Sequence, residues 1–359
     1  MADPRVTVCI PTYNRSSLLR EALESVLEQS LADIEVIILD NASTDDTADV
    51  IASLRDSRLH HVRNETNIGH LANISLGFRV GEAPLVTVLP DDDLMLPGNL
   101  ERKVAILDEQ PNVDAVYSAN NFIHIAPNGS TRIEAHYGGG KEHGVEAGDA
   151  VLRSLLTAIP PCWINFPTAV IRRSIVDDDV RLDPADGPAS DLGLALRLVR
   201  RADRVAYIAE PLVSSRVHPE AENVKERINE FESGVYKATL KWLEDRNDVK
   251  RRFLQQFGDG LRDLDDIHAG IRRASRVESV WITRRKVDGA QSIAEKWSVV
   301  REAVRREPSL LPSRELTEIL SELLPGSSGR KIRKGVQRLT RIVRRRPQRS
   351  GKAHSASNR

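Results

Sequence analysis

The sequence predicts an α/β protein: a mostly parallel sheet flanked by helices, followed by an all-helical C-terminal region. Three observations predict this class. Short apolar runs alternate with helical patterns over the first hundred residues, which is typical of βαβ units. Aromatic residues make up only 4% of the 359 residues, which disfavours a large β-sandwich. Beyond about residue 224 the apolar residues follow helical spacing throughout.

The predicted elements follow one another in strand–helix order. The first strand, Val6–Ile10, breaks at Pro11, and the helix after it has one apolar face: Leu18, Leu19, Ala22, Leu23, Val26 and Leu27. Further strands are expected at Glu35–Leu39, Arg58–Arg63, Leu85–Leu89, Ala115–Ser118, Thr168–Ile171, Val205–Ile208 and Leu212–Arg216. Further helices are expected at Thr47–Leu54, Asn73–Val80, Pro97–Glu109 and Ser190–Val199, and residues 127–150 as a loop or hairpin insertion.

Length and charge divide the chain into three parts. At about 100–200 residues per domain the chain holds about two domains, and we expect them at 1–224 and 225–325, with a basic tail at 326–359. Lys+Arg and Asp+Glu both number 52, but the 12 basic and no acidic residues at 330–359 leave a net charge of −12 on residues 1–329. The neutral total therefore conceals an acidic body with a basic tail.

Several function classes are disfavoured. Two cysteines, Cys9 and Cys162, exclude a disulfide scaffold and a cysteine-based zinc cluster. The N-terminus shows no signal-like leader, and no apolar run approaches the ~18–20 residues of a membrane span, so a cytoplasmic protein is predicted. Neither G-x-G-x-x-G nor G-x-x-x-x-G-K-[ST] occurs, which disfavours a Rossmann dehydrogenase and a P-loop NTPase.

Polar clusters follow three predicted strands, at Pro11–Arg15, Asp40–Asp45 and Asp91–Asp93. In an open parallel sheet, ligands bind in the crevice outside the carboxyl ends of the strands. Consecutive carboxylates repel one another unless a cation lies between them, and Mg²⁺ or Mn²⁺ is usually held by one or two carboxylates together with substrate phosphates. The alternative is a solvated acidic turn that caps the next helix.

Taken together, these segments resemble family 2 glycosyltransferases. The resemblance covers about residues 5–220 and rests on motifs that occur in the family's order: VTVCIPTYNR at 6–15, EVIILDNASTDDT at 35–47, NIG at 67–69, PLVTVLPDDDLMLP at 84–97, and DLGLALRL at 191–198 with YIAEPLVSSRVH at 207–218. It implies a nucleotide-sugar-dependent, inverting enzyme with the GT-A fold, which is Rossmann-like.

The resemblance also implies a donor site, residue by residue. The residues that it assigns to the nucleotide sugar are Pro11, Thr12, Tyr13, Arg15, Asp40, Asn67, Gly69 and Asp91. Among these, Tyr13 would lie against the base, and Asp40 would accept a hydrogen bond from it. Asp92, Asp93 and His218 would hold the Mg²⁺ or Mn²⁺ that bridges the diphosphate, and Arg216 would lie near that diphosphate.

For catalysis the resemblance implies that Asp191, at the start of a helix, is the base. An inverting transfer needs a cation to stabilise the leaving diphosphate and a base to deprotonate the acceptor hydroxyl. The chain departs from the family where Gly193 and Ala195 replace bulkier residues, which predicts a roomier acceptor site or weaker sugar contacts. Trp163 is a candidate to stack on an acceptor sugar, the alternative being a packing role.

The tail carries a separate signal. Ile332, Val336, Leu339 and Val343 form a narrow apolar stripe among basic residues, which is typical of a helix lying on an anionic membrane. A disordered, solvated tail is the alternative, and nucleic-acid binding is disfavoured. This predicts a protein attached peripherally to the inner face of the cell membrane.

We therefore predict an inverting, metal-dependent glycosyltransferase. It would move a sugar from a UDP-sugar to a glycan or lipid-linked acceptor, as in the synthesis of cell-surface polysaccharides. One alternative is a non-catalytic nucleotide-sugar-binding subunit that partners an active transferase. A nucleotidyltransferase would need a basic, glycine-rich loop after the first strand, which Pro11–Ser17 does not supply.

Overall fold

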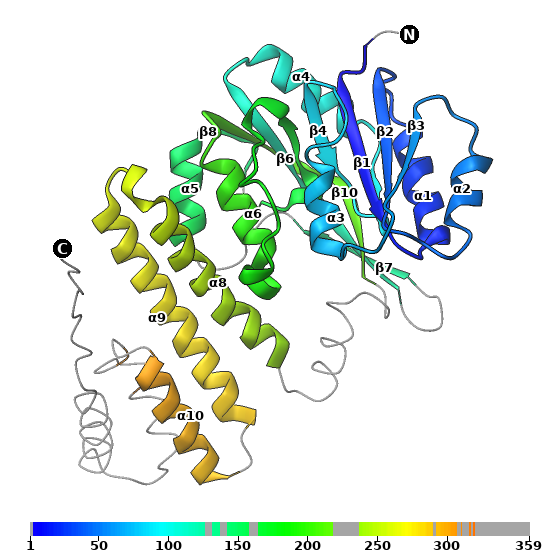
Figure 1. The fold of residues 1–359 in the computed structure, drawn as a ribbon. Helices are drawn as coiled ribbons and strands as arrows, with labels where there is room; N and C mark the ends of the chain where they lie inside the picture. Colours follow the sequence, from blue (N-terminus) through cyan, green and yellow to red (C-terminus); the bar gives the residue numbers. More distant parts are fainter. Residues whose placement is uncertain are drawn as a thin grey trace, which may run out of the picture. The chain divides into compact units, whose positions relative to one another are not determined.

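The computed structural model describes residues 3–125, 131–136, 142–157, 164–217, 237–289 and 292–306, together with Leu310, Leu316 and Ile319 (Figure 1). The chain forms two compact units, Met1–Glu232 with Lys237–Arg272, and Ser233–Tyr236 with Arg273–Arg359. The boundary predicted near residue 224 lies outside the described residues, so the division into domains at 1–224 and 225–325 stays a prediction.

The first unit is built on a ten-stranded sheet with the order β3-β2-β1-β4-β9-β6-β10-β5, with β7 paired to β6 and β8 to β10. The strands are β1 (Val6–Thr12), β2 (Ile34–Asp40), β3 (Leu59–Arg63), β4 (Leu85–Val88), β5 (Asp93–Met95), β6 (Val113–Ile125), β7 (Thr131–His136), β8 (Gly144–Ala147), β9 (Val170–Arg172) and β10 (Arg204–Val217). The helices are α1 (Ser16–Leu27), α2 (Thr47–Ser53), α3 (His70–Gly77), α4 (Asn99–Glu109), α5 (Gly148–Thr157), α6 (Ser190–Val199), α8 (Lys237–Phe257), α9 (Leu264–Gly289) and α10 (Ile293–Arg306).

The sheet is mixed, so the prediction of a mostly parallel sheet is corrected. Strands β1 to β4 pair in parallel as predicted, and β6 pairs with β10 in parallel. Strand β9 runs antiparallel to β4 and β6, and β5 and β8 run antiparallel to β10. A parallel pair needs a crossover of a dozen or more residues, which the helical patterns of the first hundred residues supply.

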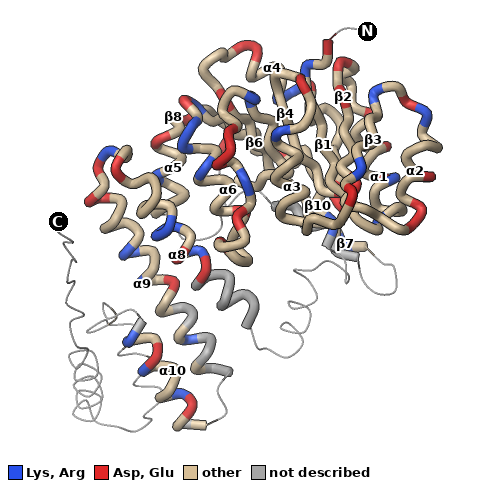
Figure 2. Tube along the Cα trace, in the orientation of Figure 1, with Lys and Arg blue, Asp and Glu red and all other residues tan. Residues whose placement is uncertain are grey.

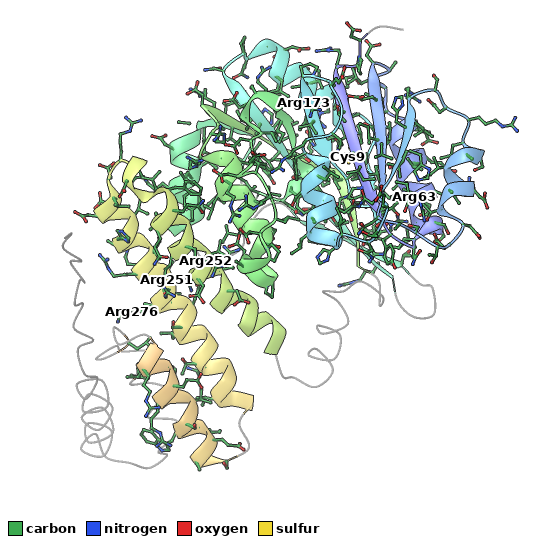
Figure 3. All side chains as sticks on the ribbon, viewed as in Figure 1. Cys9, Arg63, Arg173, Arg251, Arg252 and Arg276 are labelled. Atoms are coloured by element: carbon green, nitrogen blue, oxygen red, sulfur yellow. The ribbon has the colours of Figure 1, made fainter. Side chains whose placement is uncertain are left out.

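Helices bury both faces of the sheet. On one face α1, α2 and α4 pack against Val8 and Ile10 of β1, and on the other face α3, α5, α6 and α8 belong to the cluster around Cys9. This alternation follows from the period of two in a strand. Cys9 itself is a free, buried cysteine within the sheet (Figure 3), and burial raises the pKa of its thiol, which favours the less reactive protonated form.

Two segments differ from the expected elements. The strands expected on either side of Glu210-Pro211 are one strand, β10, which keeps its pairing with β6 through register shifts between Ile208 and Val213. The expected insertion at 127–150 contains part of the β6–β7 hairpin, but β8 and the start of α5 also fall within it. Helix α5 has a helical apolar pattern, Val151, Leu152, Leu155 and Leu156, which begins only where the polar stretch ends.

The described part of the C-terminal region is helical, as predicted. In the second unit Val287, Val300, Val304, Leu310, Leu316 and Ile319 form a small core of their own. Acidic and basic residues alternate along α10 (Figure 2), which leaves one face for this core. None of the helices in the part of the chain that the structure describes is long and apolar enough to cross a bilayer.

Candidate active site

A cavity of about 610 Å³ opens at the carboxyl ends of β1, β2 and β4. Its lining residues are Pro11, Thr12, Tyr13, Arg15, Asn41, Asn67, Gly69, His70, Asn73, Ile74, Pro90, Asp91 and Asp92. Eight of these are residues that the sequence predicted to bind the donor or the metal. A larger hollow of about 1160 Å³ lies at the opposite, amino ends of the strands, where ligands of such sheets do not usually bind.

The floor of the cavity is the acidic turn after β4. Thr12 Oγ1 donates a hydrogen bond of 2.7 Å to Asp91 Oδ2. One nitrogen of Arg15, Nη1, lies 3.2 Å from Asp91 Oδ1 and 3.1 Å from Asp92 Oδ2. Burial and the neighbouring charge of Asp92 raise the pKa of Asp91 to about 6, although Arg15 and Thr12 oppose this shift. The two carboxylates therefore face the cavity with the Arg15 guanidinium between them.

The third aspartate faces away from this cavity. Asp93 begins β5 and does not line the cavity; its carboxylate accepts hydrogen bonds from Ser215 Oγ and the Arg216 backbone N–H, both at 3.2 Å. Burial and the charge of Asp92 hold the pKa of Asp93 well above its usual range. Its role as a metal ligand, which the resemblance implied, stays a prediction, and the observed contacts are those of a structural link to β10.

Arg216 supports the turn from behind. Its guanidinium donates to the backbone carbonyls of Asp92 at 2.5 Å and Asp91 at 3.3 Å, and to Leu18 O on α1 at 3.1 Å. The same group pairs with Glu21 at 2.5 Å, and the side chain is only 3% exposed. These bonds hold the backbone of the acidic turn against α1. The backbone positions of Asp91 and Asp92 are therefore fixed.

A network of asparagine side chains forms one wall. Asn41 Nδ2 donates to Asn67 Oδ1 at 2.8 Å, and Asn64 Nδ2 donates to the side-chain oxygens of Asn41 at 3.1 Å and Asn73 at 3.0 Å. Backbone N–H groups of Ile68 and Gly69 donate to Asn41 and Asn67, which defines the orientation of both amides. The sequence predicted Asn67 but not Asn41 or Asn73; the position of Asn41 next to Asp40, at the end of a strand, is the signal that could have found it.

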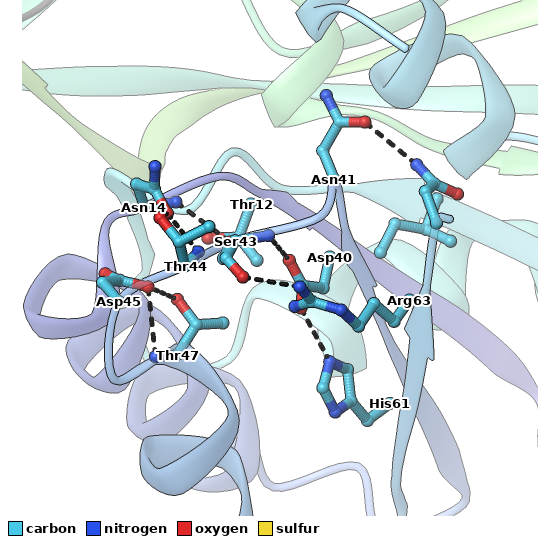
Figure 4. A network of polar contacts seen from close by, with 12 residues as sticks. Thr12, Asn14, Asp40, Asn41, Ser43, Thr44, Asp45, Thr47, His61 and Arg63 are labelled. Atoms are coloured by element: carbon cyan, nitrogen blue, oxygen red, sulfur yellow. Dashed lines mark hydrogen bonds and ion pairs between the residues drawn. The ribbon is translucent and has the colours of Figure 1, made fainter. Parts of the chain in front are cut away.

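Asp40 precedes Asn41 at the end of β2 and is fully buried, and Figure 4 shows the polar contacts around it. Its Oδ1 accepts from the Ser43 backbone N–H at 2.7 Å, and its Oδ2 accepts from Arg63 at 2.6 Å and lies 3.2 Å from His61 Nε2. Burial raises the pKa of Asp40, but these partners together lower it below its usual value. Asp40 is not among the lining residues, and its predicted contact with a base stays a prediction.

Asp191 lies in the first turn of α6, where it is exposed, and it is not among the lining residues of the cavity. The two neighbouring aspartates are already committed. Asp186 is 2% exposed and pairs with Arg197 at 2.8 Å and Arg252 at 3.0 Å, and Asp183 caps the turn before α6 by accepting from the Ala185 N–H. Of the three, Asp191 is the most exposed residue.

Gly193 does not create a roomier acceptor site. A Cβ added there would lie 2.0 Å from Asp186 Oδ2 and 2.6 Å from Arg197 Nη1. The small residue is therefore required by the buried ion pair on the inner side of α6, and Ala195 is likewise buried. Two other predicted site residues, His218 and Trp163, lie outside the described residues.

Two carboxylates at a cavity suit a hard divalent cation, which prefers oxygen ligands. Within the described residues no group of three or more His, Cys, Asp or Glu side chains is placed to hold a metal ion. Asp91 and Asp92 thus fit the arrangement in which the protein supplies two carboxylates and the substrate supplies the remaining oxygens.

Comparison with known proteins identifies the family. The model of the family described as "Glycosyl transferase family 2" matches residues 7–154, which contain the whole cavity. An uncharacterized glycosyltransferase of Rickettsia typhi is 24% identical over 282 residues, which cover 77% of this chain and 83% of the relative. The chain belongs to glycosyltransferase family 2.

Other relatives match over shorter stretches. An uncharacterized protein of Mycobacterium tuberculosis is 28% identical over 181 residues. This match covers 48% of this chain and about half (54%) of the relative's length. The GalNAc(5)-diNAcBac-PP-undecaprenol beta-1,3-glucosyltransferase of Campylobacter jejuni is 36% identical over 27% of this chain and 32% of its own length. Among solved structures, S. aureus TarS 1–349 in complex with UDP-GlcNAc has a TM-score of 0.51 at 16% identity, covering 95% of this chain and 90% of that one. The family 2 chain thus has a GT-A-like fold.

Proposed function

We propose that this family 2 chain is an inverting glycosyltransferase that moves a sugar from a UDP-sugar to a hydroxyl of a glycan or lipid-linked acceptor. The observation that supports this best is the pair of carboxylates, Asp91 and Asp92, in a crevice cavity that also contains the predicted nucleotide contacts. The lipid-linked class is supported by the name of the Campylobacter relative, which acts on an undecaprenol-linked glycan.

Each group of residues has a task in the proposed reaction. Tyr13 is 43% exposed at the rim of the cavity, where its ring is available to lie against the base. Asp91 and Asp92 would hold a Mg²⁺ or Mn²⁺ ion, which supplies Lewis-acid stabilisation of the diphosphate leaving group. Arg216 keeps their backbone in place, so the two carboxylates need little reorganisation when the donor binds.

Asp191 acts as the base in this proposal. It accepts the proton of the acceptor hydroxyl while the acceptor oxygen forms its bond to the anomeric carbon and the bond from that carbon to the diphosphate breaks. A carboxylate in its ionised form is able to take that proton. Asp186 and Asp183 are poorer candidates for the base. The carboxylate of Asp186 is paired with Arg197, and that of Asp183 accepts a hydrogen bond from the Ala185 N–H.

Release of nucleoside diphosphate from a panel of donor sugars tests this proposal. We expect release from a UDP-sugar with an acceptor present, loss of release in EDTA, and recovery on adding Mn²⁺ or Mg²⁺. Asp92→Asn should lose metal-dependent binding of UDP. Tight donor binding without turnover on any acceptor would favour the alternative, a non-catalytic nucleotide-sugar-binding subunit, and full activity in EDTA would contradict the metal's role.

A further inference from the structure

Asn14 lies between two residues that line the cavity, Tyr13 and Arg15, but is not itself among the lining residues. Its φ is 52°, in the left-handed region that residues other than glycine rarely adopt. Asparagine adopts this region more readily than most residues, because its short polar side chain can form local hydrogen bonds. The backbone therefore changes direction at Asn14, directly after the tyrosine at the rim of the cavity.

The loop between β2 and α2 holds Asn14 by its backbone and by its side chain (Figure 4). The Asn14 backbone N–H donates to Ser43 Oγ at 3.0 Å, and Asn14 Oδ1 accepts from the Thr44 backbone N–H at 2.7 Å. The same loop holds the residue before the tyrosine, because the Asn41 backbone N–H donates to the Thr12 carbonyl at 2.9 Å. Both ends of the short segment that carries the tyrosine are thus bonded to this loop.

The start of α1 has an anchor of its own. The Ser16 backbone N–H donates to Asp45 Oδ2 at 3.0 Å. Tyr13, in contrast, is 43% exposed, so packing by itself does not fix the direction of its ring. The conformation of Asn14 therefore matters more for Tyr13 than for the helix that follows.

We propose that Asn14 is a positioning residue: its left-handed conformation, fixed by Ser43 and Thr44, holds the Tyr13 ring where the base of the donor nucleotide stacks on it. This inference rests on the proposed function, because it assumes that a nucleotide occupies the cavity with its base at Tyr13. A ring that is held in place before binding loses little conformational freedom when the base stacks on it. A tyrosine on an unconstrained turn would have to be ordered during binding, which lowers the affinity.

Calorimetric titration with UDP, with Mn²⁺ present, tests this role. Asn14→Ala removes the bonds to Thr44 and disfavours the positive φ, so UDP should bind about 10-fold more weakly. Asn14→Asp keeps an oxygen acceptor and tolerates the left-handed region, so the affinity should return to within about 3-fold of the original. Inorganic diphosphate has no base to stack on Tyr13, so it should bind both variants within about 2-fold of the original.

A double-mutant cycle shows whether Asn14 acts through Tyr13. Tyr13→Ala alone should weaken UDP binding about 10-fold, because base stacking is lost. Adding Asn14→Ala to that variant should weaken binding by less than a further 2-fold or so, because no ring is left to position. A residue that only stabilised the fold would weaken the binding of UDP and of inorganic diphosphate alike, and its effect would add to that of Tyr13→Ala.

Two further variants control for folding and for the loss of an asparagine side chain. Asn14→Gly adopts a positive φ without strain, so it keeps the turn even if Asn14→Ala fails to fold. It lacks the bonds to Thr44 and should still bind UDP about 5-fold more weakly. Asn112→Ala removes an exposed asparagine that does not line the cavity, and the UDP affinity should stay within about 2-fold of the original.

An unchanged UDP affinity in both Asn14→Ala and Asn14→Gly would overturn the proposal, and so would equal losses with and without the Tyr13 ring. Failure of the proposed function would be seen separately, as UDP binding without turnover of any donor by the original protein, and would leave the positioning role intact. If UDP does not bind the original protein at all, the nucleotide site and the role of Asn14 both fall.

Discussion

Asp91, Asp92 and Asp93 are consecutive residues with three different environments. Asp91 is buried and bonded to Thr12, Asp92 is half-buried and shares Arg15 with Asp91, and Asp93 bonds to β10 on the other side of the turn. Asp91 and Asp92 lie in the turn and line the cavity, whereas Asp93 begins β5 and its carboxylate is bonded to β10. At the residue scale, the acidic triplet is two cavity carboxylates and one structural carboxylate.

Asp191 provides a test of catalysis at a single atom. Asp191→Asn is nearly isosteric but cannot accept a proton, so kcat should fall by about 100-fold or more while the affinity for the donor changes little. Steady-state kinetics together with calorimetry of UDP binding would measure both. As a control, Asp178→Asn changes an exposed carboxylate that pairs only loosely with Arg79 and should leave kcat unchanged. Retention of kcat in Asp191→Asn would mean that the base is another residue.

Lys103 gives a test of stability against pH. It is fully buried on α4, where its Nζ donates to Asn99 Oδ1 at 3.0 Å, and burial with the nearby charge of Arg102 lowers its pKa to about 7. The unfolded lysine, at about 10.4, binds more protons than the folded one between pH 7 and 10, so this group makes stability rise with pH in that window.

Lys103→Met removes the charge and keeps most of the side-chain volume. The free energy of unfolding should then increase at pH 7 by on the order of 3 kcal/mol, and its rise between pH 7 and 10 should flatten. Urea denaturation at several pH values measures both effects. An unaltered pH slope would show that Lys103 is not desolvated to this degree.

At the scale of elements, helix α6 is held in place by a buried ion cluster. Asp186, in the 3₁₀ turn Pro184–Ala189, pairs with Arg197 on α6 and Arg252 on α8, and Gly193 leaves room for its carboxylate. Figure 3 labels Arg252 on α8. Removing one partner of a buried pair leaves an uncompensated charge, which is strongly destabilising. The cluster therefore fixes the helix that carries Asp191 to a helix from beyond residue 224.

Gly193→Ala should disturb this cluster directly. The new methyl group would overlap Asp186 and Arg197, so we expect a loss of about 2 kcal/mol or more in unfolding free energy. Gly260→Ala is a matched control, because nothing lies within 4 Å of a Cβ at that position, and its effect should stay within about 0.5 kcal/mol. Thermal melts of both variants would measure the difference in stability. Equal melting temperatures of the Gly193→Ala and Gly260→Ala proteins would contradict this expectation.

At the scale of the whole molecule, the charge asymmetry predicts a membrane-binding tail. Residues 330–359 carry 12 basic and no acidic groups, but they lie outside the described residues, so the predicted amphipathic helix remains untested. Each Lys or Arg near an anionic surface contributes about 1 kcal/mol of attraction, and 1 M salt, with a Debye length of about 3 Å, screens it.

Deletion of residues 327–359 should release the protein from anionic vesicles at low salt. Transfer to a small acceptor in solution should persist, because the family match ends at residue 154, whereas transfer to a lipid-linked acceptor should slow as its local concentration falls. Sedimentation with vesicles and parallel activity assays measure these effects. If the full-length protein fails to sediment with such vesicles, the membrane role of the tail is wrong.

Local patterning was sufficient to predict the parallel half of the fold and the polar clusters at the strand ends that line much of the cavity. Strands β1, β2 and β4 are apolar runs separated by helical patterns, and the residues that follow a strand must lie at its carboxyl edge. Pro11, Thr12, Tyr13, Asp91 and Asp92 therefore lie together as expected, because their neighbourhood follows from chain order alone.

Contacts between distant segments could not be derived in this way. Asp40 contacts His61 and Arg63, which belong to another strand. Arg216 bonds to the acidic turn although it lies nearly 125 positions further along the chain. The small side chain at Gly193 is required by the neighbouring Asp186 and not by an acceptor. The antiparallel strands β5 and β9 are three residues each, too short to show a period of two. Which side chains meet in these places depends on how the sheet and helices pack. A charged residue pairs with the group that lies near it in space, and that group cannot be read from the order of residues in the sequence.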